Sequence, residues 1–254
     1  MNASDAPLPP VAPSLPEHPD RWDILRFVLF FILGLVLSLL IVIALAAVTG
    51  NLPASRRMED LTVLQTGWLN IGIAIALSIS LGGSVWFAVQ RRNRTPGAVL
   101  AFERISVFAI VGCVIGMILW AFAASFLITA VFGDVRSQIE NPLEDLVVSD
   151  ASLIAAVVLA CVVAPIAEEM LFRGLLFGWL RAHWPFWPTA LVTAALFGAA
   201  HGKAGAMYAL LAGLLGVGLA LFREHSGSLW GSISAHIANN SLFIGISLLK
   251  SVWL

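Results

Sequence analysis

Long, uninterrupted runs of apolar residues are the feature that most constrains how this chain can fold. Hydrophobic residues make up 59% of the sequence and charged residues only 11%, whereas soluble domains usually carry about 25% charged residues. A membrane-spanning helix needs about 20 consecutive apolar residues. The chain is therefore predicted to cross a membrane several times. The apolar runs are Ile24–Val48, Gly67–Val89, Ile105–Phe132, Ala151–Leu180, Trp187–Leu221 and Leu229–Leu249.

One of these runs is too long for a single membrane span. Trp187–Leu221 has 35 residues and is interrupted at His201–Gly205, so it is predicted to contain two helices, both of them short. Backbone polar groups in lipid must be satisfied within the spanning segment, and the alternating pattern of a membrane β-barrel is not seen. The predicted fold is all-α, a polytopic membrane protein with about seven transmembrane helices.

The distribution of polar residues divides the chain into three predicted parts. Residues 1–22 are polar and rich in proline and lack the pattern of a signal peptide, so a disordered tail is expected. Residues 23–150 are predicted to form a three-helix membrane scaffold. Residues 151–254 contain every candidate reactive residue and are predicted to form a catalytic core of four helices.

The charged residues predict orientation and exclude one class of partner. When the predicted helices are followed in order, nine of the 14 Lys and Arg residues fall on the side of the N-terminus. Cytoplasmic loops are enriched in these residues, so the protein is predicted to lie in the cell membrane with its N-terminus in the cytoplasm. The net charge of −1 argues against nucleic acid as a partner.

The first of three polar groups in the second half contains Glu168, Glu169 and Arg173. An ionisable group at membrane depth costs roughly 2.5–3.5 kcal/mol on insertion scales, so such a cluster indicates function. On a helix, Glu169 and Arg173 are four residues apart and pair on one face, whereas Glu168 is rotated by about 100° from Glu169. Glu168 is predicted to be the free carboxylate, suited to take a proton from water. An ion pair that only joins two helices is the structural alternative.

The other two polar groups supply imidazoles and an amide. His201 follows Phe197 by about one helical turn, and His236 and Asn240 project from the same face of their helix. An amide beside an imidazole suits the oxyanion that forms when a peptide carbonyl becomes tetrahedral. Hydrogen bonding between helices is the structural alternative for these residues.

Helix lengths predict which of these residues meet. If one helix ends at Arg181 and the next begins at Trp187, Glu168 and His201 both lie roughly 20 Å from the same hairpin, at about 1.5 Å per residue. They are therefore expected at similar depth on adjacent helices. His236 is only seven residues into its helix, so it is expected nearer the cytoplasmic side unless helices tilt or break.

Taken in order, the three groups resemble the motifs of a known family. Glu-Glu-x-x-x-Arg at 168–173, Phe-x-x-x-His at 197–201 and His-x-x-x-Asn at 236–240 are similar to motifs of the CPBP family. These are the CAAX proteases and bacteriocin-processing intramembrane proteases, including the eukaryotic endoprotease Rce. The resemblance covers about Ala151–Leu249. It implies an intramembrane endopeptidase that acts on a membrane-embedded or membrane-associated peptide or protein.

The resemblance also implies a role for each motif: a carboxylate that activates water, a supporting ion pair, and an oxyanion or water-positioning site. The residues in these roles are, in order, Glu168 assisted by His201, Glu169 with Arg173, and His236 with Asn240. The activation of the water has two alternatives. Glu168, His201 and His236 supply three ligands to a zinc ion whose fourth position holds water, or Glu168 acts without a metal. The His-Glu-x-x-His spacing of many zinc proteases is absent from the sequence.

Two other functions compete with proteolysis. A non-proteolytic membrane protein, for example an immunity protein, would use the same residues to bind a peptide or another membrane protein. The intact motifs argue against such a degenerate binder. A proton-coupled transporter would use Glu168, Glu169 and His201 as a proton relay.

Overall fold

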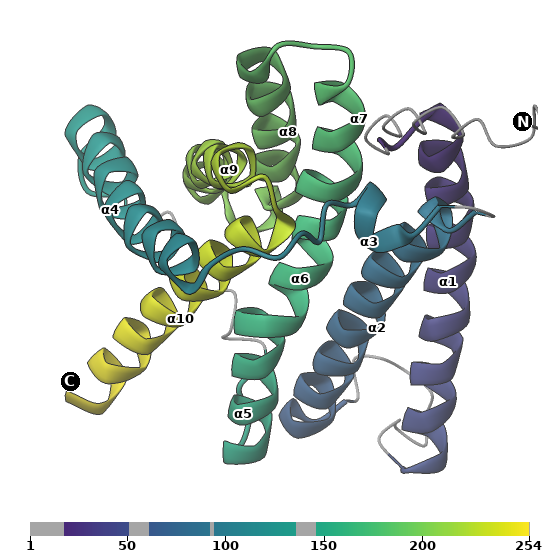
Figure 1. Ribbon diagram of the computed structural model, residues 1–254. Helices are drawn as coiled ribbons and strands as arrows, with labels where there is room; N and C mark the ends of the chain where they lie inside the picture. The colour runs from purple at the N-terminus through teal and green to yellow at the C-terminus, as the bar shows by residue number, and fades with distance from the viewer. Residues whose placement is uncertain (1–17, 51–60, 92–93, 136–145, 254) are drawn as a thin grey trace, which may run out of the picture.

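Helices account for nearly all of the structure in the computed structural model, which describes residues 18–50, 61–91, 94–135 and 146–253 (Figure 1). No β-strand occurs in these parts of the chain, and six helices are long and apolar enough to span a membrane. The predicted all-α polytopic fold is confirmed. In chain order the helical segments are α1 (Arg21–Val48), α2 (Val63–Val89), α3 (Pro96–Val99), α4 (Val107–Phe132), α5 (Asp150–Val158), the π-helical η3 (Leu159–Val163), α6 (Ala164–Glu169), the π-helical η4 (Met170–Leu176), α7 (Phe177–Arg181), α8 (Phe186–Ala200), the 3₁₀ turn η5 (Gly202–Ala204), α9 (Ala206–Ser226) and α10 (Leu229–Trp253).

The run from Trp187 to Leu221 contains two helices, as predicted, but only one of them is short. α8 has 15 residues, whereas α9 has 21 and is long enough to span a membrane. The prediction that both are short is wrong for α9 because this helix continues beyond Leu221 to Ser226. Gly227, in the left-handed conformation with φ 66°, ends it.

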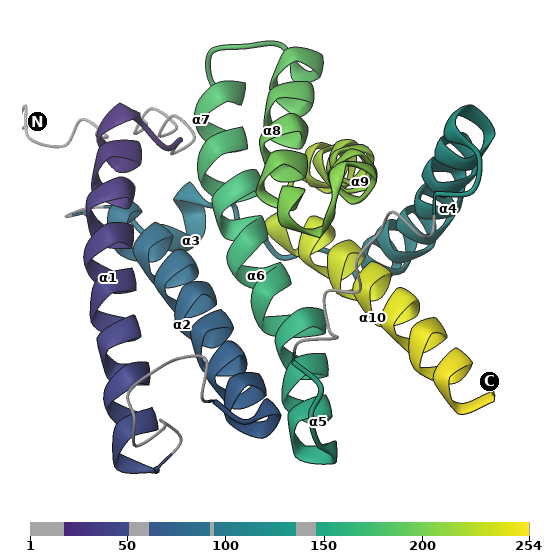
Figure 2. The ribbon, with the colours of Figure 1, turned by 180° about the vertical axis from the view of Figure 1, so that it is seen from behind.

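The segments from α5 to α7 form one nearly continuous helical column between two groups of helices (Figures 1 and 2). α1 and α2 pack together on one side of the column, and α2 contacts α6. α4, α9 and α10 contact one another on the other side, where α8 also packs against α9. Figure 1 shows α9 almost end-on, so this helix runs across the direction of α1, α2 and the column.

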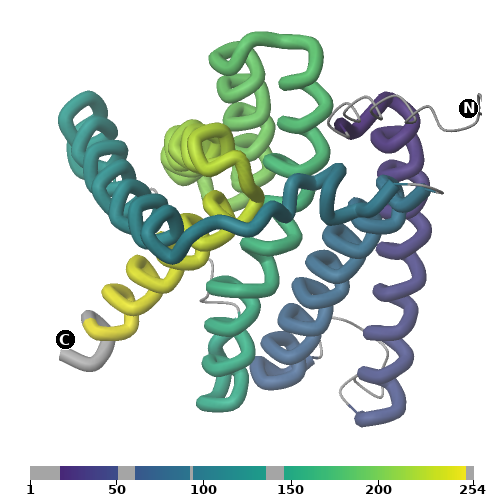
Figure 3. The backbone as a smooth tube through the Cα atoms, viewed as in Figure 1, coloured from purple at the N-terminus to yellow at the C-terminus, as the bar shows by residue number. Residues whose placement is uncertain are grey.

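The connection between α3 and α4 crosses the column and holds the beginning of α10 (Figure 3). Leu100 is fully buried and packs in the same core cluster as Leu229. The backbone N–H of Leu229 donates to the carbonyl of Ala101 at 2.7 Å, and the hydroxyl of Ser228 donates to the carbonyl of Glu103 at 2.6 Å. α10 therefore begins beside the middle of the column rather than level with the end of α7 (Figure 1).

An ion-pair cluster joins the beginning of α1 to the end of α2. The carboxylate of Asp20 caps α1 and lies 2.9 Å from the guanidinium of Arg91. Arg91 also lies 2.7 Å from the fully buried Asp23, and Arg94 lies 3.3 Å from Asp23. Burial raises the pKa of Asp20, but hydrogen bonds from Arg91 and from the backbone of Asp23 and Trp22 outweigh it, so the pKa is lower than usual.

Asp20→Asn is expected to remove a pH-dependent contribution to stability. The pKa of Asp20 in the folded protein lies below the ordinary value of 3.8, so its carboxylate stabilises the fold above that pH. The contribution is lost as the pH falls below about 4 through the folded-state pKa. Thermal unfolding of both proteins in detergent, near neutral pH and at about pH 3, measures it. The Tm of the wild type should exceed that of the variant only near neutral pH. An equal difference in Tm at both pH values would contradict this prediction.

α8 and α9 approach each other most closely at glycine. A Cβ atom added at Gly198 would lie 2.5 Å from the carbonyl oxygen of Ala209 and 3.1 Å from the backbone of Gly213. Both contacts involve backbone atoms, which cannot move aside as a flexible side chain does. Gly198 lies within the Phe-x-x-x-His motif, so this close contact also sets where the C-terminal end of α8 lies.

Gly198→Ala is expected to destabilise the protein by about 1–3 kcal/mol, because the added methyl group forces α8 and α9 apart. The matched control is Gly112→Ala on α4, where an added Cβ meets nothing within 4 Å and alanine favours the helix. Thermal unfolding in detergent should show a lower Tm for Gly198→Ala and an unchanged or higher Tm for the control. Equal Tm values for the two variants would be the contrary result.

Candidate active site

Three separate helices bring the predicted polar residues together. Glu168 and Glu169 lie at the end of α6, His201 follows the last residue of α8, and His236 lies in α10. The Oε2 atom of Glu168 is 4.0 Å from Nε2 of His201 and 3.8 Å from Nε2 of His236. One carboxylate therefore lies beside two imidazoles that are distant in the sequence.

His236 lies at the same level as Glu168, contrary to the expected difference in depth. That expectation placed the beginning of its helix at the membrane surface. In the structure, α9 crosses the bundle and α10 begins beside the middle of the column, where Leu229 is bonded to Ala101 (Figure 1). A residue about two turns into α10 therefore reaches α6.

Glu169 and Arg173 form a completely buried ion pair at the centre of the site. Nη1 of Arg173 donates to Oε1 of Glu169 at 3.1 Å, and Nη2 donates to the carbonyl of Gly216 at 2.9 Å. The same Oε1 atom accepts a hydrogen bond from Nδ1 of His236 at 3.0 Å. The four-residue spacing predicted the pairing with Arg173. The bond to His236 joins residues 67 positions apart, and no spacing rule predicts it.

Phe197 is the aromatic centre around which the site residues pack. Its ring centroid is 4.6 Å from that of His201 and 5.7 Å from that of His236. The guanidinium carbon of Arg173 lies 4.6 Å from the same centroid, which is a favourable cation–π distance. Phe197 is itself buried, so it limits the movement of both imidazoles. In the sequence this residue stands out only as the first position of a motif.

Hydrogen bonds on Nδ1 orient both imidazoles. Nδ1 of His201 lies 2.8 Å from the carbonyl oxygen of Phe197, and a carbonyl only accepts, so this nitrogen carries the proton. The carboxylate of Glu169 accepts from Nδ1 of His236 in the same way. In each neutral ring the Nε2 atom then presents its lone pair towards Glu168.

The space between Glu168 and the two Nε2 atoms suits a water molecule. The separations of 3.8 and 4.0 Å are too long for direct hydrogen bonds. A carboxylate and two imidazole lone pairs are all acceptors, and water supplies the donors that bridge such distances. The side chains of Glu168 and His201 are 23% and 25% exposed, whereas His236 is 6% exposed, so the site is open on the side of Glu168 and His201.

The side chain of Asn240 is hydrogen-bonded to the central column. Its Nδ2 atom donates to the carbonyl of Ala160 in η3 at 2.9 Å, and its Oδ1 atom accepts from Nδ2 of the buried Asn239 at 3.1 Å. The shared helix face of His236 and Asn240 suggested an oxyanion site. The structure adds a contact with α5–α7 that the sequence did not predict.

Metal binding gains no support from the side-chain geometry. Among the described residues, no group of three or more His, Cys, Asp or Glu side chains could hold a metal ion. The zinc alternative, with Glu168, His201 and His236 as ligands, and the metalloprotease assignment are therefore unsupported.

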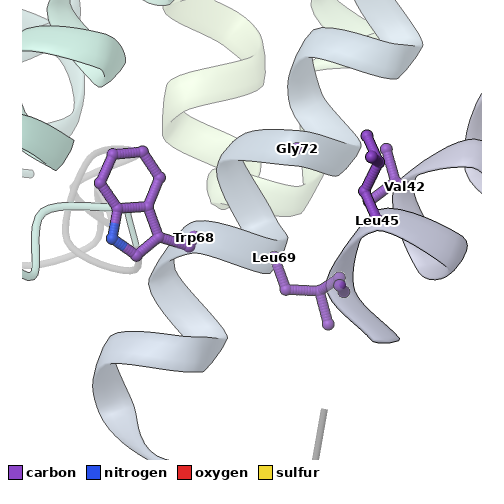
Figure 4. A pocket seen from close by; sticks show the side chains of 6 residues that line it. Val42, Leu45, Trp68, Leu69 and Gly72 are labelled. Carbon is purple, nitrogen blue, oxygen red and sulfur yellow. The ribbon is translucent and has the colours of Figure 1, made fainter. Parts of the chain in front are cut away.

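A separate apolar pocket lies between α1 and α2 (Figure 4). Its volume is about 240 Å³, and none of the side chains that line it is ionisable. None of them belongs to the three motifs, so this pocket is not part of the candidate active site. The lining residues are Val42, Leu45, Ala46, Trp68, Leu69 and Gly72.

Glu169→Gln is expected to destabilise the protein by about 3–5 kcal/mol, because it leaves the buried guanidinium of Arg173 without its counter-charge. The matched control is Glu224→Gln, which removes an exposed ion pair with Arg181 and should cost about 0–1 kcal/mol. Thermal unfolding of the two variants in detergent compares them directly. If the Tm falls no further in Glu169→Gln than in the control, the buried pair does not hold the helices together.

Comparison with protein families assigns one part of the chain to a class. Residues 150–242 match the family model described as type II CAAX prenyl endopeptidase Rce1-like, and this stretch includes all six predicted site residues. This match confirms the resemblance to the CPBP and CAAX protease family for residues 150–242. At the level of the family, the domain is that of a membrane endopeptidase. No curated protein and no solved structure matched the chain.

Proposed function

We propose that this protein is an intramembrane endopeptidase in which Glu168 activates the hydrolytic water. The observation that carries the proposal is the partly exposed carboxylate of Glu168, which faces the Nε2 atoms of two imidazoles held through Nδ1. The Rce1-like domain supports the general activity. The substrate is a peptide or protein embedded in or associated with the membrane. The protein resides in the cell membrane with its N-terminus in the cytoplasm.

In the proposed reaction, Glu168 takes a proton from water while the water oxygen attacks the carbonyl carbon of the scissile bond. His201 accepts a hydrogen bond from the water through Nε2 and so orients it. The tetrahedral intermediate then collapses, the bond between carbon and nitrogen breaks, and Glu168 transfers its proton to the leaving amine. Glu168 thus gains one proton and loses it again within one turnover.

His236 is the proposed partner of the developing oxyanion. Glu169 accepts a hydrogen bond from Nδ1 of His236, and a carboxylate in this position stabilises the imidazolium form of the ring. A proton taken up from solvent before the substrate binds gives that form, in which Nε2–H is a donor that faces the same space as Glu168. Glu169 and Arg173 therefore support the reaction through His236 without touching the substrate.

Glu168→Gln is expected to reduce hydrolysis by about 100-fold or more, the usual contribution of a general base. The Tm should stay unchanged, because the side chain is partly exposed and glutamine keeps its shape. The assay incubates purified protein in proteoliposomes with a library of membrane peptides and identifies cleavage products by mass spectrometry. The matched control is His225→Ala, an exposed imidazole near the end of α9, which should cleave like the wild type.

Measurements on the same proteoliposomes separate the competing functions. Products made by the wild type and the control but not by Glu168→Gln would support the protease. Peptide binding without cleavage would favour the non-proteolytic membrane protein. Proton flux into the vesicles that persists in His236→Ala and Asn240→Ala would favour the transporter.

A further inference from the structure

Pro165 leaves one carbonyl of the central column without its backbone partner. In η3, N–H groups bond to the carbonyl five residues earlier, as the N–H of Ala164 does with the carbonyl of Leu159. The next N–H in this register would come from position 165 and reach the carbonyl of Ala160. Proline has no N–H, so this carbonyl must find another donor or remain unpaired, which is unfavourable at membrane depth.

The side chain of Asn240 is that donor. Its Nδ2 atom lies 2.9 Å from the carbonyl oxygen of Ala160. The orientation of the amide is set from the other side, where Oδ1 accepts a hydrogen bond from Asn239. Both ends of the Asn240 amide are therefore used within the protein.

We propose that Asn240 is a positioning residue that replaces the N–H missing at Pro165 and thereby sets the distance between Glu168 and His236. Pro165 lies one turn before Glu168 on the column, and Asn240 lies one turn after His236 on α10. The bond from Asn240 to Ala160 thus joins the two segments that carry the reacting groups, whose nearest atoms are 3.8 Å apart. This role differs from the oxyanion donor that the family resemblance implies for Asn240. It rests on the proposed function only where hydrolysis is measured.

A double-mutant cycle tests the proposal, because Pro165→Ala restores a backbone N–H that can reach Ala160. Asn240→Ala alone should lower the Tm and reduce hydrolysis about 100-fold, as misplaced catalytic groups do. In the Pro165→Ala background the same substitution should cost markedly less in both measurements. The matched control combines Asn240→Ala with Pro188→Ala. Pro188 is an exposed proline in the first turn of α8, so its replacement should restore neither the Tm nor hydrolysis.

Each outcome has a defined meaning. Recovery of Tm and hydrolysis together supports the positioning role. Recovery of the Tm without hydrolysis assigns the amide of Asn240 to the reaction itself and overturns the proposal, and so does the lack of any recovery in Tm.

Two further cases keep the test decisive. If Asn240→Ala alone does not fold, the double variant with Pro165→Ala should still fold, and its failure overturns the proposal. The Tm comparison needs no substrate, so a protein that hydrolyses nothing would defeat the proposed function without affecting this part of the test.

Discussion

The carboxylate of Glu169 is the interaction on which the arrangement of the site depends. Its Oε1 atom accepts hydrogen bonds from both Arg173 and His236, and Arg173 reaches on to the carbonyl of Gly216. One buried charge thus links α6, η4, α9 and α10. Removing either charged partner would leave the other uncompensated where water does not reach, so these helices are held together by the penalty of separating them.

Close packing of backbones makes room for this network. A Cβ atom at Gly216 would lie 3.1 Å from Nη2 of Arg173 and equally close to Ala194. Because the glycine has no side chain, the guanidinium passes between α9 and α8 and also packs over Phe197. The glycine at 198 has the same effect where α8 meets α9. Small residues therefore set the separation of the helices, and that separation places His201 beside Glu168.

Much of the fold and part of the site could be predicted because they depend on local properties. Apolar runs of about 20 residues determine membrane helices through the cost of exposing backbone to lipid. The pairing of Glu169 with Arg173 follows from 3.6 residues per turn. The division into a tail, a scaffold and a catalytic core stays a prediction, and in the structure α4 contacts α9 and α10.

The sequence by itself determined that the chain is a bundle of membrane helices and that one carboxylate of the pair is matched by an arginine. Only the tertiary structure decided that α10 begins beside the middle of the column, that Glu169 also holds His236, and that Asn240 reaches Ala160. The reason is physical. Contacts between segments 67 to 125 residues apart depend on how helices cross and where their ends are fixed. The periodicity within one helix predicts neither the crossing of helices nor the position of their ends.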